Sequence, residues 1–238
     1  NIPLGIIATF LTLTFVKSPK YGEKLKANQV DWWGIVFLAS FIGSLQFVLE
    51  HGQQDDWFND SLILFLSVLS LVGLLAFIWR EMTYKYPIVN LSVLKDGNLR
   101  IGTVMCFILG FGLYGSTLII PIYTQAILGW TATDAGLLLI PGSLATAFMM
   151  PIIGNMIQKG VPQGYMVGVG FVIFFFFTFW MYNVMTPDTG VEHMFWPLIL
   201  RGIGLGLLFV PITTLSLSTL KGKHIGEGAA FTGMMRQL

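Results

Sequence analysis

Long apolar runs, separated by short polar segments, dominate this chain. Seven runs are rich in aliphatic and aromatic residues and nearly free of charge: about 2–16, 32–49, 61–79, 101–127, 135–157, 164–186 and 196–220. Most approach or exceed the roughly 20 residues with which an α-helix crosses the ~30 Å hydrocarbon core of a bilayer. The pattern therefore predicts an all-α polytopic membrane protein, with about seven transmembrane helices passing through the lipid bilayer.

The polar segments between these runs alternate in charge. Lys and Arg follow the first, third, fifth and seventh runs: Lys17, Lys20, Lys24, Lys26, Arg80, Lys85, Lys95, Arg100, Lys159, Lys221, Lys223 and Arg236. The loops after the second, fourth and sixth runs contain acidic residues and no Lys or Arg. Because basic loops stay on the cytoplasmic side, we predict that 17–31, 80–100, 159–163 and 221–238 are cytoplasmic.

Composition agrees with a membrane protein and argues against several other classes. Charged residues are 11% of the chain, against roughly 25% in soluble domains. The basic residues form no cluster in a soluble part, so no nucleic acid partner is expected. The single cysteine is Cys106, and the histidines at 51, 193 and 224 are far apart. With no Gly-Lys-Ser/Thr phosphate loop and no Ser/His/Asp set, we expect neither enzyme activity, nor a cofactor, nor a metal site.

Helix breakers occur inside the predicted spans. Membrane helices tolerate proline because neighbouring helices, hydroxyl groups and water can satisfy the freed backbone groups, and glycine lets helices approach closely. These positions are predicted either to serve packing or to kink helices that rock during transport. The residues concerned are Gly110, Pro121, Pro141, Pro151, Gly202, Gly206 and Pro211.

A largely polar stripe runs along the predicted helix at 101–127. On a wheel of about 100° per residue its members fall within an arc about 100° wide. They are Thr103, Cys106, Gly110, Tyr114, Thr117, Pro121, Thr124 and Gln125, whereas Ser116 lies on the opposite face. An unpaired hydroxyl or amide in hydrocarbon costs a few kcal/mol. The stripe should therefore face either a neighbouring helix or a wet cavity, and Thr103, Tyr114, Thr117, Thr124 and Gln125 are candidate substrate-pathway residues.

Two other helices are distinctive. The run at 164–186 is phenylalanine-rich on every side, which predicts a peripheral position. The run at 196–220 contains Arg201, a permanent charge within a predicted span. Such residues are costly in a bilayer and commonly functional, although an arginine near the interface can also extend its side chain to the surface. Its partner could be substrate, a carboxylate elsewhere in the protein, or a backbone carbonyl freed by a proline; Arg201 is therefore a further pathway candidate.

Several short strings occur in a characteristic order and spacing. They are Asn1-Ile2-Pro3-Leu4-Gly5, Gly43-Ser44-Leu45-Gln46, Asp56-Trp57-Phe58, Pro87-Ile88-Val89-Asn90-Leu91, Leu128-Gly129, Ala135-Gly136-Leu137 and Arg201-Gly202. Together they resemble the fourteen-helix drug:proton antiporters of the EmrB/QacA type, a branch of the major facilitator superfamily. The resemblance covers essentially the whole chain. It departs from the family at Asn90, where many members have Asp.

The resemblance implies a division of the chain and a function. Residues 1–17 would be the last helix of the N-terminal bundle, 18–86 an inserted helix pair with cytoplasmic linkers, and 87–238 the first part of a C-terminal six-helix bundle. The chain would then be part of a longer protein, with its proton-coupling acids upstream of Asn1.

The implied protein exports hydrophobic or cationic drugs in exchange for protons, by alternating access, across the bacterial inner membrane. A periplasmic adaptor protein is the implied partner. Two alternatives stay open: a major facilitator exporter of a metabolite, siderophore or lipid, and a non-transporting membrane subunit.

Overall fold

The computed structural model describes residues 2–16, 30–84 and 91–237, and within them the chain forms helices and no strand. By its internal contacts the chain divides into two units, Asn1–Val30 and Asp31–Leu238. The first unit contributes helix α1 (Ile2–Phe15), an apolar helix of 14 residues. Its large apolar side chains at Ile2, Ile6, Ile7, Phe10, Leu11, Leu13 and Phe15 are exposed. The first predicted span is thus helical, although the described helix is shorter than the roughly 20 residues of a full span.

Helices α2 (Trp32–His51) and α3 (Ser61–Thr83) form an antiparallel hairpin. Asp31 caps α2, because its carboxylate accepts a hydrogen bond from the backbone N–H of Gly34. The same carboxylate pairs with Arg80 near the end of α3, with Nη2 and Oδ1 3.0 Å apart. One acidic residue therefore both starts one helix and attaches the end of the other.

The string Asp56-Trp57-Phe58 lies in the turn between α2 and α3. Asp56 and Trp57 both have positive φ, 54° and 52°, and Trp57 begins the short 3-10 helix η2 (Trp57–Asn59). The indole of Trp57 lies so close to Gly52 that a Cβ there would be 2.6 Å from the ring. The glycine and the tryptophan therefore depend on each other sterically.

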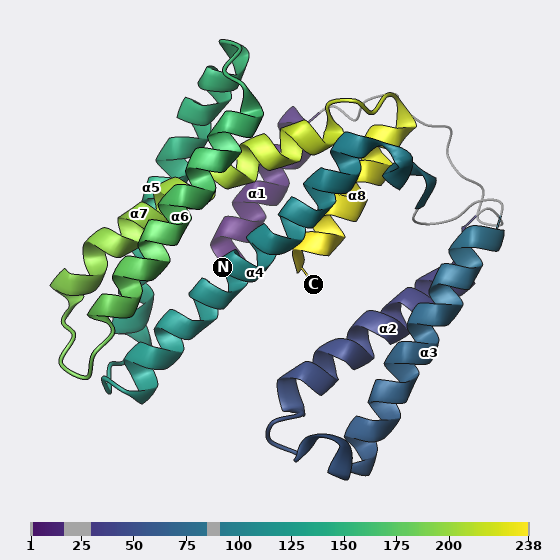
Figure 1. Ribbon diagram of the computed structural model, residues 1–238, viewed down its shortest axis with the longest axis horizontal. Helices are drawn as coiled ribbons and strands as arrows, with labels where there is room; N and C mark the ends of the chain where they lie inside the picture. The colour runs from purple at the N-terminus through teal and green to yellow at the C-terminus, as the bar shows by residue number, and fades with distance from the viewer. Residues whose placement is uncertain (1, 17–29, 85–90, 238) are drawn as a thin grey trace. The chain divides into compact units, whose positions relative to one another are not determined.

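The remaining helices form a bundle around α7 (Figure 1). They are α4 (Gly97–Ala126), preceded by the 3-10 helix η3 (Leu91–Lys95), then α5 (Ala132–Gln158), α6 (Gln163–Val184), α7 (Val191–Leu217) and α8 (Lys223–Gln237). Helix α7 packs against α4, α5, α6 and α8. Within its most apolar stretch 56% of residues are buried, against at most 28% in the other five candidate spans. Helix α7 is therefore the central helix of the bundle.

Close backbone approach gives α7 this position. A Cβ on Gly202 of α7 would be 2.1 Å from the carbonyl oxygen of Gly142 in α5. A Cβ on Gly142 would likewise meet the carbonyl of Leu198 at 2.6 Å. At Gly206, for which packing was one of the two predicted roles, a Cβ would be 2.9 Å from that of Met149. Pro141, Pro151 and Pro211 lie inside helices α5 and α7, as expected.

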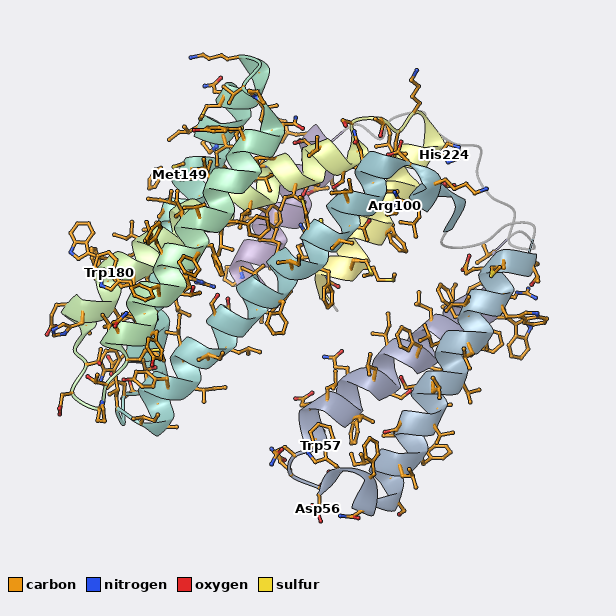
Figure 2. The ribbon with its side chains drawn as sticks, viewed as in Figure 1. Asp56, Trp57, Arg100, Met149, Trp180 and His224 are labelled. Carbon is orange, nitrogen blue, oxygen red and sulfur yellow. The ribbon has the colours of Figure 1, made fainter. Side chains whose placement is uncertain are left out.

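Helix α6 packs on α7 along one face only. Phe177 is buried there, in a cluster with Ile120 and Leu198. Phe175, Phe176 and Phe179 remain exposed on the other face, and Trp180 projects from it (Figure 2). Large aromatic residues on an unpaired helix face suit a lipid environment. The peripheral position of α6 remains a prediction, because 28% of its most apolar stretch is buried, as in α4.

Six helices in the described residues, α2 to α7, are long and apolar enough to cross a membrane. The prediction of a loop over 221–238 was wrong, because residues 223–237 form helix α8. This helix is poor in apolar residues, so the hydrophobic pattern did not reveal it. It packs along α4, where a Cβ on Gly110 would be 2.0 Å from the carbonyl oxygen of Arg236.

The position of Arg236 changes with this correction. Gly110 lies thirteen residues from the start of α4, which is about 20 Å at 1.5 Å per residue. Arg236 therefore lies beside the middle of a spanning helix, not in a loop at its end. Its guanidinium stacks on the ring of Phe209 in α7, 4.3 Å from the ring centroid, a favourable cation–π geometry.

Candidate functional site: a cavity with a buried arginine

Arg201 lies deep in the bundle, not near the end of its helix. Helix α7 begins at Val191, ten residues earlier, and the side chain of Arg201 is only 6% exposed. Ten residues of α-helix span about 15 Å. The side chain therefore does not extend to the surface. The sequence had left that possibility open, because the predicted helix began only at Trp196.

The guanidinium of Arg201 is held by helix α4. Its Nε donates to Oγ of Ser116 at 2.8 Å, and its Nη2 donates to Oγ1 of Thr117 at 2.5 Å. A longer contact of 3.5 Å joins Nη2 to the carbonyl of Leu113. Both hydroxyls donate their own protons to carbonyls one turn earlier in α4. Their lone pairs are thereby left to accept from the arginine.

A cavity of about 280 Å³ opens beside this arginine, between α4, α5 and α7. Its polar lining consists of Arg201, Thr117, Ser143 and Thr146. The remaining lining residues are apolar: Leu113, Leu139, Met150, Leu205 and Phe209. An apolar cavity with a few convergent polar groups is the usual form of a small-molecule site.

The charge of this cavity is uncompensated within the described residues. The partners of Arg201 there are two hydroxyls and a carbonyl, and its Nη1 has no hydrogen-bond partner among them. In the described helices α4 to α7, acidic residues occur only in first turns, at Asp134 and Glu192. Arginine keeps its proton at any physiological pH, so the cavity carries a permanent positive charge.

The polar stripe of α4 does not form one continuous surface. Thr117 lines the cavity with Arg201, but Thr103 is buried without a hydrogen-bond partner in the described residues. Thr124 is fully buried, and its hydroxyl bonds the carbonyl of Pro121. Gln125 is exposed and bonds the same carbonyl, while Tyr114 is 44% exposed. Of the predicted pathway residues, only Thr117 and Arg201 meet at this cavity; the roles of all six remain predictions.

Sequence reasoning missed three polar residues near this cavity. Ser116 was assigned to the opposite face of α4, yet the long arginine side chain reaches both it and Thr117. Ser143 and Thr146 lie on α5, and Thr146 donates to the carbonyl of Gly202 at 3.0 Å. The one available signal was their spacing of three residues, which places both hydroxyls on one helix face.

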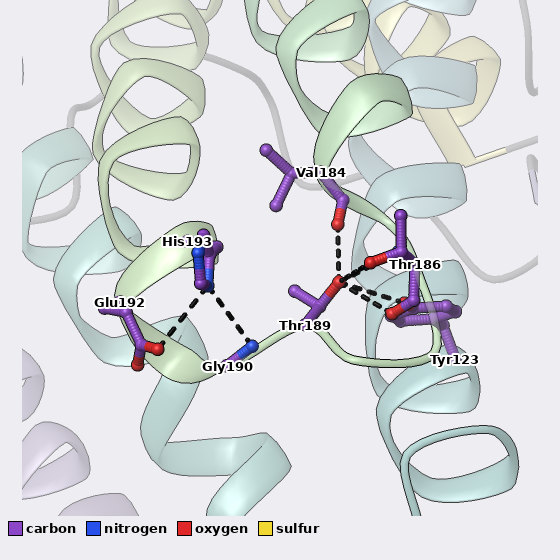
Figure 3. A network of polar contacts seen from close by, with 7 residues as sticks. All are labelled: Tyr123, Val184, Thr186, Thr189, Gly190, Glu192 and His193. Carbon is purple, nitrogen blue, oxygen red and sulfur yellow. Dashed lines mark hydrogen bonds and ion pairs between the residues drawn. The ribbon is translucent and has the colours of Figure 1, made fainter.

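A polar network fixes the end of α4 remote from η3 (Figure 3). The hydroxyl of Tyr123 donates to the carbonyl of Thr186, 2.6 Å away, in the segment between α6 and α7. Thr189 organises this segment, because its hydroxyl contacts the carbonyls of Val184 and Thr186 and accepts from the backbone N–H of Thr186 at 2.8 Å. The α6–α7 connection is thus attached to α4 beyond the cavity.

A second polar cluster joins α4 and α7 at their other ends. Asp96 caps α4 by accepting from the backbone N–H of Leu99 at 2.9 Å, and it also accepts from the hydroxyl of Thr219 at 2.8 Å. Asn98 donates to Ser218 at 3.3 Å. The hydrogen bond from Leu99, and then that from Thr219, lower the pKa of the Asp96 carboxyl from its usual range. The two helices that hold the arginine site are therefore connected through this carboxylate.

Spanning helices that pack around a glycine-containing central helix, with a largely apolar cavity at mid-depth, define a polytopic membrane protein with a candidate small-molecule site. The family model of the Major Facilitator Superfamily matches residues 2–238. The chain therefore belongs to the Major Facilitator Superfamily. It is a multi-pass protein of the bacterial inner membrane from a family of transporters, not of enzymes.

Relatives with described roles match all or most of the chain. It is 33% identical to the fatty acid resistance protein FarB of Neisseria gonorrhoeae and 29% identical to the multidrug export protein EmrB of Escherichia coli, in each case over 100% of this chain and 46% of the relative. A colistin resistance protein EmrB of Acinetobacter baumannii is 26% identical over 89% of this chain and 41% of the relative. The chain thus spans about half the length of these relatives, and the resemblance to EmrB-type exporters is confirmed.

The predicted division at residues 17/18 and 86/87 remains a prediction. The basic segment with Lys17, Lys20, Lys24 and Lys26, and the string Pro87-Ile88-Val89-Asn90, lie outside the described residues. So does Lys85. The cytoplasmic assignment of these segments rests on the charge pattern alone.

Proposed function

We propose that the protein is a secondary transporter that exports hydrophobic compounds in exchange for protons by alternating access. Its family and its EmrB-type relatives support the export role. The cavity at Arg201 is the observation that supports small-molecule binding in this part of the chain. Hydrophobic or cationic drugs were both expected as substrates, and the positive cavity favours the hydrophobic class because it repels a cation.

Proton coupling needs a group that gains and loses a proton. Arg201 cannot serve, since a guanidinium does not release its proton in this pH range. The coupling acid is therefore proposed to lie upstream of Asn1, and a periplasmic adaptor remains the proposed partner. Arg201 would act on substrate or on that acid through its fixed charge.

The test uses the full-length protein in inside-out membrane vesicles. When the vesicle lumen is made acidic, the vesicles should accumulate the uncharged hydrophobic dye Nile red, and a protonophore should abolish the accumulation. Vesicles without the protein provide the background. Accumulation that is unchanged by the protonophore would contradict proton coupling, and accumulation no greater than background would contradict export of this compound class.

A lipid exporter on the same scaffold is the second candidate function. The relative from Neisseria gonorrhoeae is named for fatty acid resistance and shares 33% identity over the whole of this chain. Expression of the full-length protein in a pump-deficient strain should then raise tolerance to laurate. Comparing laurate with an uncharged hydrophobic dye separates this candidate from export of hydrophobic drugs, because only laurate carries a negative charge.

A further inference from the structure

We infer that the cavity between α4, α5 and α7 binds the anionic headgroup of an amphipathic carboxylate, with Arg201 as the residue that binds it. This inference deepens the proposed function and rests on it, because it names the chemistry of the transported compound at this site. The observations that carry it are the buried charge, its neutral partners and the apolar lining.

The first step concerns the charge. Arg201 is nine-tenths buried yet has only neutral partners within the described residues. A buried cation is stable only when it is paired, solvated or hydrogen-bonded to opposite charge, since desolvation costs several kcal/mol. A carboxylate in the cavity supplies this opposite charge. A cationic compound in the same place would add a second positive charge and be repelled.

The second step concerns the donors. Thr117, Ser143 and Thr146 line the cavity, but each hydroxyl donates its proton to a backbone carbonyl. Among the described lining residues, Nη1 of Arg201 is the donor that remains available to a ligand, because Nε and Nη2 already donate to Ser116 and Thr117. Guanidinium and carboxylate match as planar groups and form strong charge-assisted hydrogen bonds. The site is therefore selective for an acceptor-only group.

The third step concerns size and polarity. Five of the nine lining residues are apolar, which suits a hydrocarbon next to the headgroup. The volume of about 280 Å³ lies just below the ~300–1,000 Å³ of typical ligand pockets. The cavity therefore fits a carboxylate with its first methylene groups, and the remainder of a longer chain would extend beyond it.

The experiment measures binding of radiolabelled laurate to the full-length protein in nanodiscs at pH 8, where the carboxyl group is ionised. Unlabelled laurate should displace the label at least about tenfold more effectively than dodecanol or dodecyltrimethylammonium, because only laurate forms the charged pair. Arg201→Gln should weaken laurate binding by about tenfold or more, and Arg201→Lys by less, since lysine keeps the charge. Lys159→Gln, which removes an exposed cation at the end of α5, should leave binding unchanged.

Two outcomes would overturn the inference. One is equal competition by the three compounds, which share a twelve-carbon chain, on the unmodified protein; this test needs no variant to fold. The other is unchanged laurate affinity in Arg201→Gln; if proton-driven dye export fails at the same time, the arginine pairs with a protein carboxylate instead. Binding is measured without a proton gradient. The binding result therefore does not depend on whether the protein exchanges its substrate for protons.

Discussion

Arg201 on α7 donates through its Nε to the hydroxyl of Ser116 on α4, 2.8 Å away, and these residues are 85 positions apart in the chain. The bond joins two helices next to a cavity and leaves part of a permanent charge facing it. Because α7 lies beside α4 and the Arg201 side chain is long, a polar site forms within an apolar bundle.

The contact between Arg201 and α4 should contribute to stability. Ser116→Ala with Thr117→Val removes both hydroxyl acceptors, and unsatisfied donors cost about 1–3 kcal/mol each, more for charged groups. We expect a lower thermal midpoint for the purified full-length protein, measured by size-exclusion after heating. Thr214→Val is the control, because Thr214 is exposed and its hydroxyl bonds only its own helix. An equal midpoint for the double variant and the control would contradict the structure.

Gly202 should tolerate no side chain. Gly202→Ala would place a methyl group 2.1 Å from the carbonyl oxygen of Gly142, which is backbone and cannot rotate away. Overpacking of this kind costs roughly 1–3 kcal/mol, so the yield of monodisperse protein and its thermal midpoint should fall. Gly168→Ala is the matched control, since nothing lies within 4 Å of the added Cβ. Equal midpoints in the two variants would contradict the close approach of α7 to α5, because the higher helix propensity of Ala favours both variants alike.

Water should reach the centre of the α4 stripe but not Thr103. Cysteines at Thr117 and Ser143, which line the cavity, should react with a small hydrophilic thiol reagent. A cysteine at Thr103 should react far more slowly, because that side chain is 5% exposed. The native Cys106 is 1% exposed and serves as the internal baseline. Similar rates at all three introduced cysteines would mean that the stripe is one continuous aqueous surface.

The predicted orientation can be tested in intact cells. A cysteine at Lys95 should be shielded from an impermeant thiol reagent, whereas cysteines at Gln54 and Asp188 should be labelled. All three positions are exposed, so differences in labelling report the side of the membrane and not burial. Asp188 is preferable to its neighbour Thr189, whose side chain is buried and hydrogen-bonded. Labelling of Lys95→Cys from outside would reverse the orientation.

Asp96 should make stability depend on pH in the acidic range. Its pKa is lowered in the folded protein by the hydrogen bonds from Leu99 and Thr219. A group with a lowered folded-state pKa stabilises fully above its unfolded value and loses that contribution as pH falls through the folded value. The midpoint difference between the unmodified protein and Asp96→Asn should therefore be constant near neutral pH and shrink below about pH 4. A difference that is the same at pH 7 and pH 3 would contradict this.

The sequence by itself determined the helices and the family. Long charge-free runs have only one stable form in a bilayer, because every backbone polar group must be bonded within its own helix. The six full-length spans therefore appear where hydrophobicity predicted them. Helix α8 was missed because its mixed composition carries no such signal, and its place along α4 depends on Gly110.

Only the tertiary structure decided which polar residues meet. The wheel of α4 separated Ser116 from Thr117, but a guanidinium long enough to reach both makes them partners of Arg201. Ser143 and Thr146 join the site because Gly142 and Gly202 let α5 approach α7 at this depth. Periodicity gives the direction of a side chain on its own helix. Contacts between helices follow from close packing, which depends on residues far apart in the chain.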